Sequence, residues 1–218
     1  MRNMNRKFAW LLVTAASLFA CLATADESFS AEAAAELAAT LQSYRTYQAD
    51  FIQIVVNETG SRVQETNGRL KAKRPGLFYW EVNQPMAQFI ASDGERVSVY
   101  DPDLEQVTIH KLDQRASSTP ALLLSGEVRN LAETYRVSER QFGDKLREFT
   151  LAPRNPDSLF VTLKLSFADG VLQEMRLTDS LAQLSILSFS NVRLNQGLSD
   201  SDFTLDYPEG VDIIRDEG

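Results

Sequence analysis

A strict alternation of residues from 159 to 167 is the feature that most limits how this chain can fold. Successive side chains of a β-strand point to opposite faces of a sheet, so such a pattern predicts a strand with one apolar face and one mostly polar face. The predicted apolar face carries Leu159, Val161, Leu163, Leu165 and Phe167.

Similar short segments recur along the chain, and turn signals such as Ser92-Asp93-Gly94 and Ala168-Asp169-Gly170 separate them. Strands divided by turns at intervals of eight to twelve residues are typical of an antiparallel all-β domain. Gly68 lies inside one predicted strand and indicates a β-bulge. We expect strands at 47–56, 62–73, 77–85, 86–91, 97–100, 105–112, 135–141, 146–151, 159–167, 171–178 and 184–194, and an extended piece at 203–212.

Two segments have helical character. Ser30 can cap a helix over 31–44, a stretch rich in alanine, leucine and glutamate. A brief helix is expected at 119–126, where Thr119-Pro120 suits the start and Gly126 the stop. The second helix carries Leu122, Leu123 and Leu124 in succession, which leaves little polar surface to face water. Another part of the protein must cover these leucines.

The first 25 residues predict a cleaved secretory signal peptide. Three basic residues precede the apolar run 8–22, and Ala23-Thr24-Ala25 fits a signal-peptidase site. The apolar run is short for a membrane span. A weaker alternative is lipidation at Cys21, because Leu18-Phe19-Ala20-Cys21 approximates a lipoprotein box, although Phe19 is bulky where a small residue is preferred. We expect residues 26–218 to form one domain.

Cleavage would change the composition of the exported chain. Removing 25 of the 218 residues leaves 193, and the loss of three basic and no acidic residues shifts the net charge from −8 to −11. Such an acidic protein should be repelled by nucleic acid and by anionic membranes. Cys21 is the sole cysteine, so the exported chain would have no disulfide.

The sequence offers no catalytic constellation, and we predict neither a metal, a cofactor nor an enzymatic activity. His110 is the single histidine, so no second histidine or cysteine can complete a metal site or a Cys–His pair. Ser92-Asp93-Gly94 is a turn rather than a nucleophile elbow. A pair of glycosidase carboxylates is a spatial signature, and the sequence alone leaves it open.

The stretch 71–82 combines a cation, a proline and a run of aromatic residues. Pro75 marks a strand boundary, and alternation puts Phe78, Trp80 and Val82 on one wholly apolar face of the strand that follows. The pattern fits an ordinary half-buried strand whose apolar face packs in a core. It also fits a strand whose aromatic face lines a cavity, with Arg74 at the mouth.

These residues resemble the periplasmic lipoprotein carrier family, the LolA type, over essentially the whole exported chain. The most specific part is the run from Arg74-Pro75 to Phe78 and Trp80, followed by the downstream turns. The other matching segments are Ala49-Asp50-Phe51-Ile52-Gln53, Gly68-Arg69-Leu70, Pro85, Ser92-Asp93-Gly94, Tyr100-Asp101-Pro102, Glu105-Gln106-Val107, Thr119-Pro120-Ala121-Leu122-Leu123-Leu124, Phe203-Thr204-Leu205 and Pro208-Glu209-Gly210-Val211.

The resemblance implies an unclosed antiparallel β-barrel, a strongly curved sheet, with an α-helical lid over an apolar cavity. The arginine that holds the lid in the family falls on Arg74, and the aromatic cavity wall on Phe78 and Trp80. We add Val82 from the alternation, and Leu122, Leu123 and Leu124 as lid residues that partly fill the empty cavity. Where the family often has a tryptophan, this chain has Ser98, which puts the shape of that wall in question.

The resemblance also implies a function in the periplasm of a Gram-negative bacterium. Such carriers take acylated lipoproteins from an inner-membrane ABC transporter and pass them to an outer-membrane acceptor. We expect a monomer that binds no nucleic acid. Three alternatives stay open: the lipidated outer-membrane acceptor of the same fold, a periplasmic lipid-sensing regulatory module, and an all-β secreted hydrolase.

Overall fold

The computed structural model describes residues 28–112, 120–126 and 128–216. The predicted signal peptide and the lipidation motif at Cys21 lie outside the described residues, as does Thr119. No helix in these three described ranges is long and apolar enough to cross a membrane.

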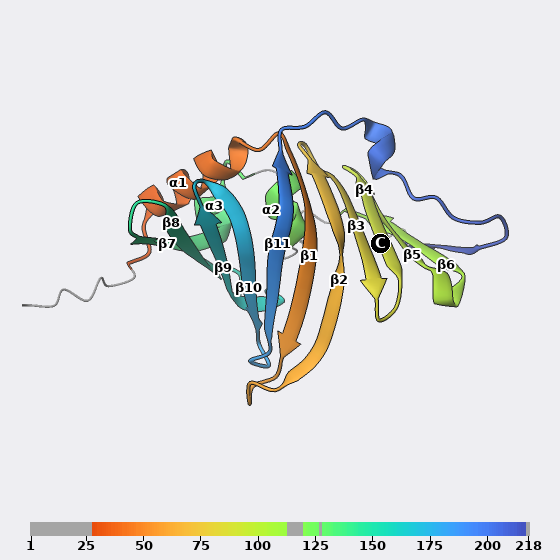
Figure 1. The fold of residues 1–218 in the computed structure, drawn as a ribbon, viewed down its shortest axis with the longest axis horizontal. Helices are drawn as coiled ribbons and strands as arrows, with labels where there is room; N and C mark the ends of the chain where they lie inside the picture. The colour runs from red at the N-terminus through yellow and green to blue at the C-terminus, as the bar shows by residue number, and fades with distance from the viewer. Residues whose placement is uncertain (1–27, 113–119, 127, 217–218) are drawn as a thin grey trace, which may run out of the picture.

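One curved sheet of twelve strands dominates the molecule (Figure 1). Its strand order is β12-β6-β5-β4-β3-β2-β1-β11-β10-β9-β8-β7, so β1 joins two antiparallel meanders and the outermost strands, β12 and β7, do not pair with each other. The prediction of a mainly β, unclosed and strongly curved sheet is therefore confirmed. The strands are β1 Thr46–Val56, β2 Arg62–Lys73, β3 Leu77–Gln84, β4 Gln88–Asp93, β5 Arg96–Asp101, β6 Gln106–Lys111, β7 Tyr135–Phe142, β8 Leu146–Pro153, β9 Phe160–Ala168, β10 Val171–Asp179, β11 Leu184–Leu194 and β12 Asp212–Asp216.

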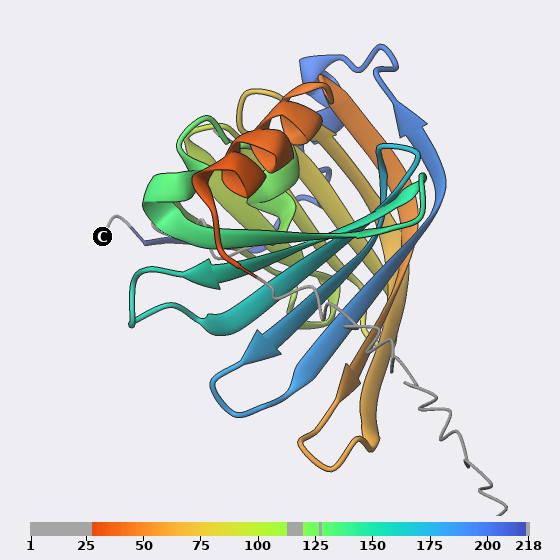
Figure 2. The ribbon, with the colours of Figure 1, turned by 90° about the vertical axis from the view of Figure 1, so that its left-hand side faces the viewer.

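Three short α-helices lie together on the inner side of the curve (Figure 2). They are α1 (Ala31–Gln42), α2 (Pro120–Ser125) and α3 (Leu131–Thr134); α3 was not predicted. The side chain of Ser30 accepts a hydrogen bond of 3.0 Å from the backbone N–H of Ala33, which confirms the predicted cap of α1. Two 3₁₀ turns, η1 (Pro102–Leu104) and η3 (Asp200–Phe203), complete the described helical structure.

The main core lies between the helices and the part of the sheet formed by β1, β2 and β7–β11. Leu37 and Leu41 of α1 are fully buried there, together with Phe149 of β8 and Phe167 of β9. Phe78 belongs to a second, smaller cluster with Val97 on the other half of the sheet. Trp80 and Val82 of the same strand pack against the main core, so β3 contributes to both clusters.

The apolar face predicted for residues 159–167 is wrong at its start. Leu163, Leu165 and Phe167 are buried, but Leu159 is 76% exposed and Val161 55% exposed, whereas Phe160 is 2% exposed. The register between β9 and β10 shifts between Phe160 and Thr162, so the residues at the start of β9 lie on the face opposite to the one that alternation predicts for them.

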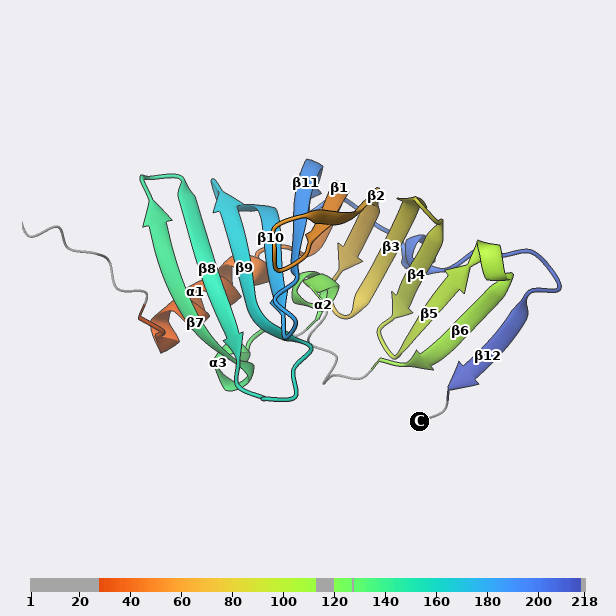
Figure 3. The same ribbon diagram turned by 90° about the horizontal axis from the view of Figure 1, so that it is seen from below.

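The C-terminal segment also differs from the prediction. Residues 204–211 form no regular strand, and the last strand is β12, which begins at Asp212 and pairs with β6 in parallel (Figure 3). Every other strand pair of the sheet is antiparallel. A parallel partner joins strands far apart in sequence, so the turn signals could not indicate it.

Candidate functional site: an apolar cavity inside the curved sheet

Strand β3 presents its aromatic residues to the inner side of the sheet. Phe78 is 6% exposed, and Trp80 and Val82 are half-buried. The ring of Trp80 lies 4.5 Å from that of Phe51 on β1, centroid to centroid. β3 pairs with β2 and β4 over most of its length, which fixes the direction in which these side chains point.

All three side chains line a cavity of about 690 Å³. This volume falls within the range of about 300–1,000 Å³ that is usual for sites that bind small molecules. Most of the wall comes from β3, β4 and β5 on one side and from β10 and β11 on the other. The other apolar lining residues are Pro85, Met86, Ala87, Ile90, Val97, Val99, Leu112, Leu177 and Leu187.

Arg74 connects the start of β3 to helix α2. Its guanidinium Nη2 donates a hydrogen bond of 2.7 Å to the carbonyl of Leu123, and Nη1 donates to the carbonyl of Gly126. Two residues further on, the backbone N–H of Gly76 donates to the carbonyl of Ser125 at 2.7 Å. The last turn of a helix leaves its carbonyls without intrahelical partners, and these three bonds satisfy carbonyls at that end of α2.

The described leucine side chains of α2 do not line the cavity, in contrast to the aromatic residues of β3. Leu123 and Leu124 are 4% and 2% exposed and belong to the main core rather than to the cavity wall. The side chain of Leu122 lies outside the described part of the structure. The predicted contact of these leucines with a ligand therefore stays a prediction.

Ser98 does not line the cavity, although its neighbours Val97 and Val99 do. It lies between them on β5, so its side chain points to the opposite face of the sheet. Serine at this position therefore leaves the described cavity wall intact.

The sequence analysis missed the polar residues of the cavity. Gln53 and Thr66 line it from β1 and β2, and His110 lines it from β6. Alternation would have placed Gln53 on the same face as Phe51, but a polar residue in a strand gives no signal that it faces an apolar concavity. The other polar lining residues are Gln64, Gln88, Asp101, Lys111 and Ser185.

Among the described residues, no group of three or more histidine, cysteine, aspartate or glutamate side chains could hold a metal ion. His110 is the single histidine of the chain, and it lies on the cavity wall. The lining offers apolar surface for burial together with neutral and charged side chains that can form hydrogen bonds.

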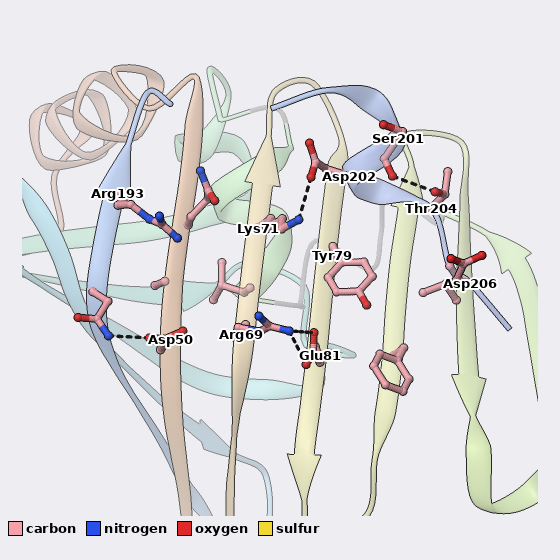
Figure 4. A pocket seen from close by; sticks show the side chains of 16 residues that line it. Asp50, Arg69, Lys71, Tyr79, Glu81, Arg193, Ser201, Asp202, Thr204 and Asp206 are labelled. Atoms are coloured by element: carbon pink, nitrogen blue, oxygen red, sulfur yellow. Dashed lines mark hydrogen bonds and ion pairs between the residues drawn. The ribbon is translucent and has the colours of Figure 1, made fainter. Parts of the chain in front are cut away.

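A second pocket, of about 490 Å³, lies on the outer face of the sheet beneath η3 (Figure 4). Four of its charged side chains form two ion pairs: Arg69 donates to both carboxylate oxygens of Glu81 at 2.9 and 2.8 Å, and Lys71 lies 2.9 Å from Asp202. The bond from Lys71 and those from Ser199 lower the pKa of Asp202 to about 2. A pocket of paired charges does not suit an acyl chain, so the inner cavity is the candidate site.

A curved sheet with an apolar cavity on its inner face and short helices beside it defines a class of proteins that can enclose a lipid. Residues 42–206 match the family model described as "Outer membrane lipoprotein carrier protein LolA". The chain belongs to this family of carriers, which are non-enzymatic transport proteins.

Curated relatives cover nearly the whole chain. An outer-membrane lipoprotein carrier protein of Chromohalobacter salexigens is 43% identical over 213 residues, which are 98% of this chain and 100% of that protein. One of Pseudomonas aeruginosa is 43% identical over 206 residues, which are 94% of this chain and 97% of that protein.

Solved structures show the same fold at low sequence identity. A LolA-superfamily protein from Nitrosomonas europaea is 15% identical, with a TM-score of 0.50 over 83% of this chain and 100% of that chain. An uncharacterised conserved protein from Thermus thermophilus is also 15% identical, with a TM-score of 0.53 over 85% of this chain and 99% of that chain.

Proposed function

We propose that this protein carries lipoproteins through the periplasm by enclosing their acyl chains in the inner cavity. The observation that carries the proposal is the apolar wall formed by Phe78, Trp80 and Val82 around about 690 Å³ of space. The family and the names of the relatives support the same role. Phe78 and Trp80 would contact the acyl chains directly.

A carrier must bind acyl chains without retaining them. Burying one methylene group is worth about 0.8 kcal/mol, so a chain of about 15 carbons could contribute roughly 12 kcal/mol before entropy costs. Release of such a ligand would be very slow. Loading the cavity must therefore also cost free energy, so that the net affinity for the acyl chains stays moderate. We propose that this cost comes from moving helix α2.

We propose that α2 acts as a lid that Arg74 holds in its closed position. Hydrogen bonds from a charged donor are worth about 1.5–3 kcal/mol each, and Arg74 donates to two carbonyls at the end of α2. Loading would move the lid and strain these bonds, and release would restore them. Leu122, Leu123 and Leu124 would then exchange contacts within the protein for contacts with acyl chains.

The family supports a proposal for the partners. We propose that the protein receives lipoproteins from an inner-membrane ABC transporter and delivers them to an outer-membrane acceptor, acting as a monomer. The net charge, −8 for the full chain and −11 after the predicted cleavage, disfavours direct adsorption to anionic membrane surfaces, which a soluble carrier must avoid.

A two-step transfer assay tests this function. Purified protein is mixed with inner-membrane vesicles that contain the transporter and a radiolabelled lipoprotein, and the supernatant is then added to membranes that contain the acceptor. We expect ATP-dependent release of lipoprotein into the supernatant and its subsequent appearance in the acceptor membrane. A regulatory module would bind lipid without completing the second step, and failure at both steps would contradict the proposal.

A further inference from the structure

The wall of the inner cavity is apolar near α2 and becomes polar toward the opposite end of β2. Near α2, strand β2 pairs Ala72 with Phe78 and Leu70 with Trp80, and the wall is apolar. Towards the opposite end of β2, Thr66 lies across from Gln53 of β1. Since a strand rises about 3.3 Å per residue, Thr66 is roughly 25 Å along the chain from Arg74 and the lid.

The far end of the wall carries four neutral polar residues, which we call the polar belt: Gln53, Gln64, Thr66 and Ser185. Strand register places them in two adjacent rows. Gln53 lies opposite Thr66, and Val55 lies between Gln64 on one side and Ser185 on the other. Within the described residues, the side chains of these four residues make no hydrogen bond to other groups of the protein.

Thr66 gives the main evidence that the belt could bind a polar group of a ligand. Its side chain is 7% exposed, and its buried hydroxyl has no hydrogen-bond partner among the described residues. A buried hydroxyl without a partner costs about 1–3 kcal/mol. Rotation of Thr66 about χ1, between staggered positions, exchanges its hydroxyl and methyl group and can turn the hydroxyl toward a ligand in the cavity.

We propose that the polar belt binds the carbonyl groups of the ester and amide linkages that attach acyl chains to the cargo. This inference rests on the proposed function and gives the ligand an orientation. The acyl chains would run toward Phe78 and the α2 end, and the carbonyl groups would lie at the belt, where Thr66 and the amide groups of Gln53 and Gln64 can donate to them.

The charges of the cavity favour a neutral linkage over a phosphate group. All four belt residues are uncharged. Asp101, an anion, lines the same cavity at the end of β5 that pairs with Gln106, whereas Lys111, a cation of the lining, lies opposite Arg96 at the other end of β5. A phosphate brought to this end would meet no cation of the belt and would be repelled by Asp101. Carbonyl groups, in contrast, lose their hydration on entry and need the donors that the belt supplies.

The test compares two synthetic lipopeptides of equal chain length. One is a cysteinyl peptide with two ester-linked palmitoyl chains on its glyceryl group, and the other carries the same chains through ether linkages, which lack the carbonyls. Dissociation constants are measured by displacement of a fluorescent acyl probe from wild-type protein, Thr66→Val and Thr66→Ser. Thr178→Val is the matched control, because Thr178 lies on β10 outside the cavity lining.

We expect Thr66→Val to weaken binding of the ester lipopeptide about fivefold and to leave the ether analogue within twofold, since a net hydrogen bond is worth about 1 kcal/mol. Thr66→Ser, which keeps the hydroxyl, should bind the ester lipopeptide about as tightly as the wild-type protein does. Thr178→Val should change neither dissociation constant. Equal effects of Thr66→Val on both lipopeptides, or no effect on either, would overturn the inference while leaving the carrier function intact. Failure of the wild-type protein to bind either lipopeptide would instead contradict the proposed function.

A second measurement covers the case in which Thr66→Val does not fold. The ester carbonyls of the lipopeptide are labelled with carbon-13, and their infrared band is recorded in the wild-type complex and in the Gln53→Leu complex. Hydrogen bonding to the belt should move the wild-type band below its position in hydrocarbon solvent, and Gln53→Leu should move part of it back. A wild-type band at the hydrocarbon position would overturn the inference.

Discussion

Arg74 makes side-chain contacts that join the aromatic strand to the helix beside the cavity. It offers five donors in a planar fork, and two of its nitrogens reach the carbonyls of Leu123 and Gly126. Lysine carries a compact charge on a flexible chain and would satisfy these two carbonyls less well. The identity of this residue should therefore affect how the lid closes.

Replacing Arg74 by leucine should produce a carrier that loads but does not release. Two hydrogen bonds of about 1.5–3 kcal/mol each would be lost from the closed state, so closure would no longer help to expel the cargo. In the two-step assay, Arg74→Leu should release lipoprotein from inner-membrane vesicles and then retain it, with Arg74→Lys intermediate. Normal delivery to the acceptor, or failure of the folded variant to load, would contradict the proposal that Arg74 holds the lid closed.

Phe78 tests whether the aromatic wall is a binding surface. A carboxylate at this position would face the cavity, where charge is costly to bury, so Phe78→Glu should remain folded but fail to receive cargo. Leu77→Glu is the matched control, since Leu77 is the adjacent residue on the opposite face of β3. Circular dichroism reports folding, and probe binding reports loading. Outright unfolding of Phe78→Glu would mean that Phe78 serves only as core.

At the scale of elements, the pairing of β2 with β3 depends on Gly68. The register of this pair shifts between Asn67, which pairs with Gln84, and Gly68, which pairs with Val82, so the extra residue is Asn83 of β3 rather than Gly68, where the bulge was predicted. A Cβ atom on Gly68 would lie 1.7 Å from the carbonyl oxygen of Glu81 and 2.9 Å from the ring of Phe51. Only a residue without a side chain allows the two strands to approach this closely.

Gly68→Ala should therefore destabilise the protein by about 1–3 kcal/mol or more, the usual cost of overpacking. Gly197→Ala is a suitable control, because Gly197 has no positive φ and a Cβ atom there would meet nothing within 4 Å. The free energy of unfolding is measured by urea denaturation of both variants. Equal stability of the two variants would show that the pairing of β2 with β3 can absorb a methyl group at Gly68.

The ion pair of Lys71 with Asp202 attaches η3 to the outer face of β2, and it should make this attachment sensitive to acid. The pKa of Asp202 is lowered to about 2, so its contribution to stability is present above its ordinary pKa of 3.8 and is lost as the pH falls from about 4 to 2. Replacement of Lys71 by methionine should reduce this loss. Thermal unfolding midpoints are measured between pH 5 and pH 2 for both proteins, and an unchanged pH dependence would contradict the assignment.

At the scale of the whole molecule, local patterns predicted most strands but not how they assemble. Alternation located β11 at 184–194 and the inner face of β3, because both depend only on neighbouring residues. The pairing of β1 with β11 and of β6 with β12 joins segments over 100 residues apart, and no local signal specifies such partners. The family resemblance supplied the curved, unclosed sheet that alternation alone left undetermined.

The sequence likewise predicted one part of the candidate site and not the other. Phe78, Trp80 and Val82 could be predicted as one apolar surface from their spacing, whereas the polar belt could not. Leu123 and Leu124 look like cavity residues in sequence because they are apolar and adjacent, but the packing of α2 against the sheet places them in the main core. Only the three-dimensional arrangement distinguishes an apolar residue that faces a cavity from one that faces the core.

Native mass spectrometry of the protein isolated from periplasm tests the central claim most directly. We expect a chain that begins at Asp26 in a one-to-one complex with acylated lipoproteins, and we expect Phe78→Glu to be isolated without them. Leu77→Glu should carry the same cargo as the wild-type protein. A wild-type protein that carries no acylated partner, or one that begins at a lipidated Cys21, would contradict the account of a soluble carrier.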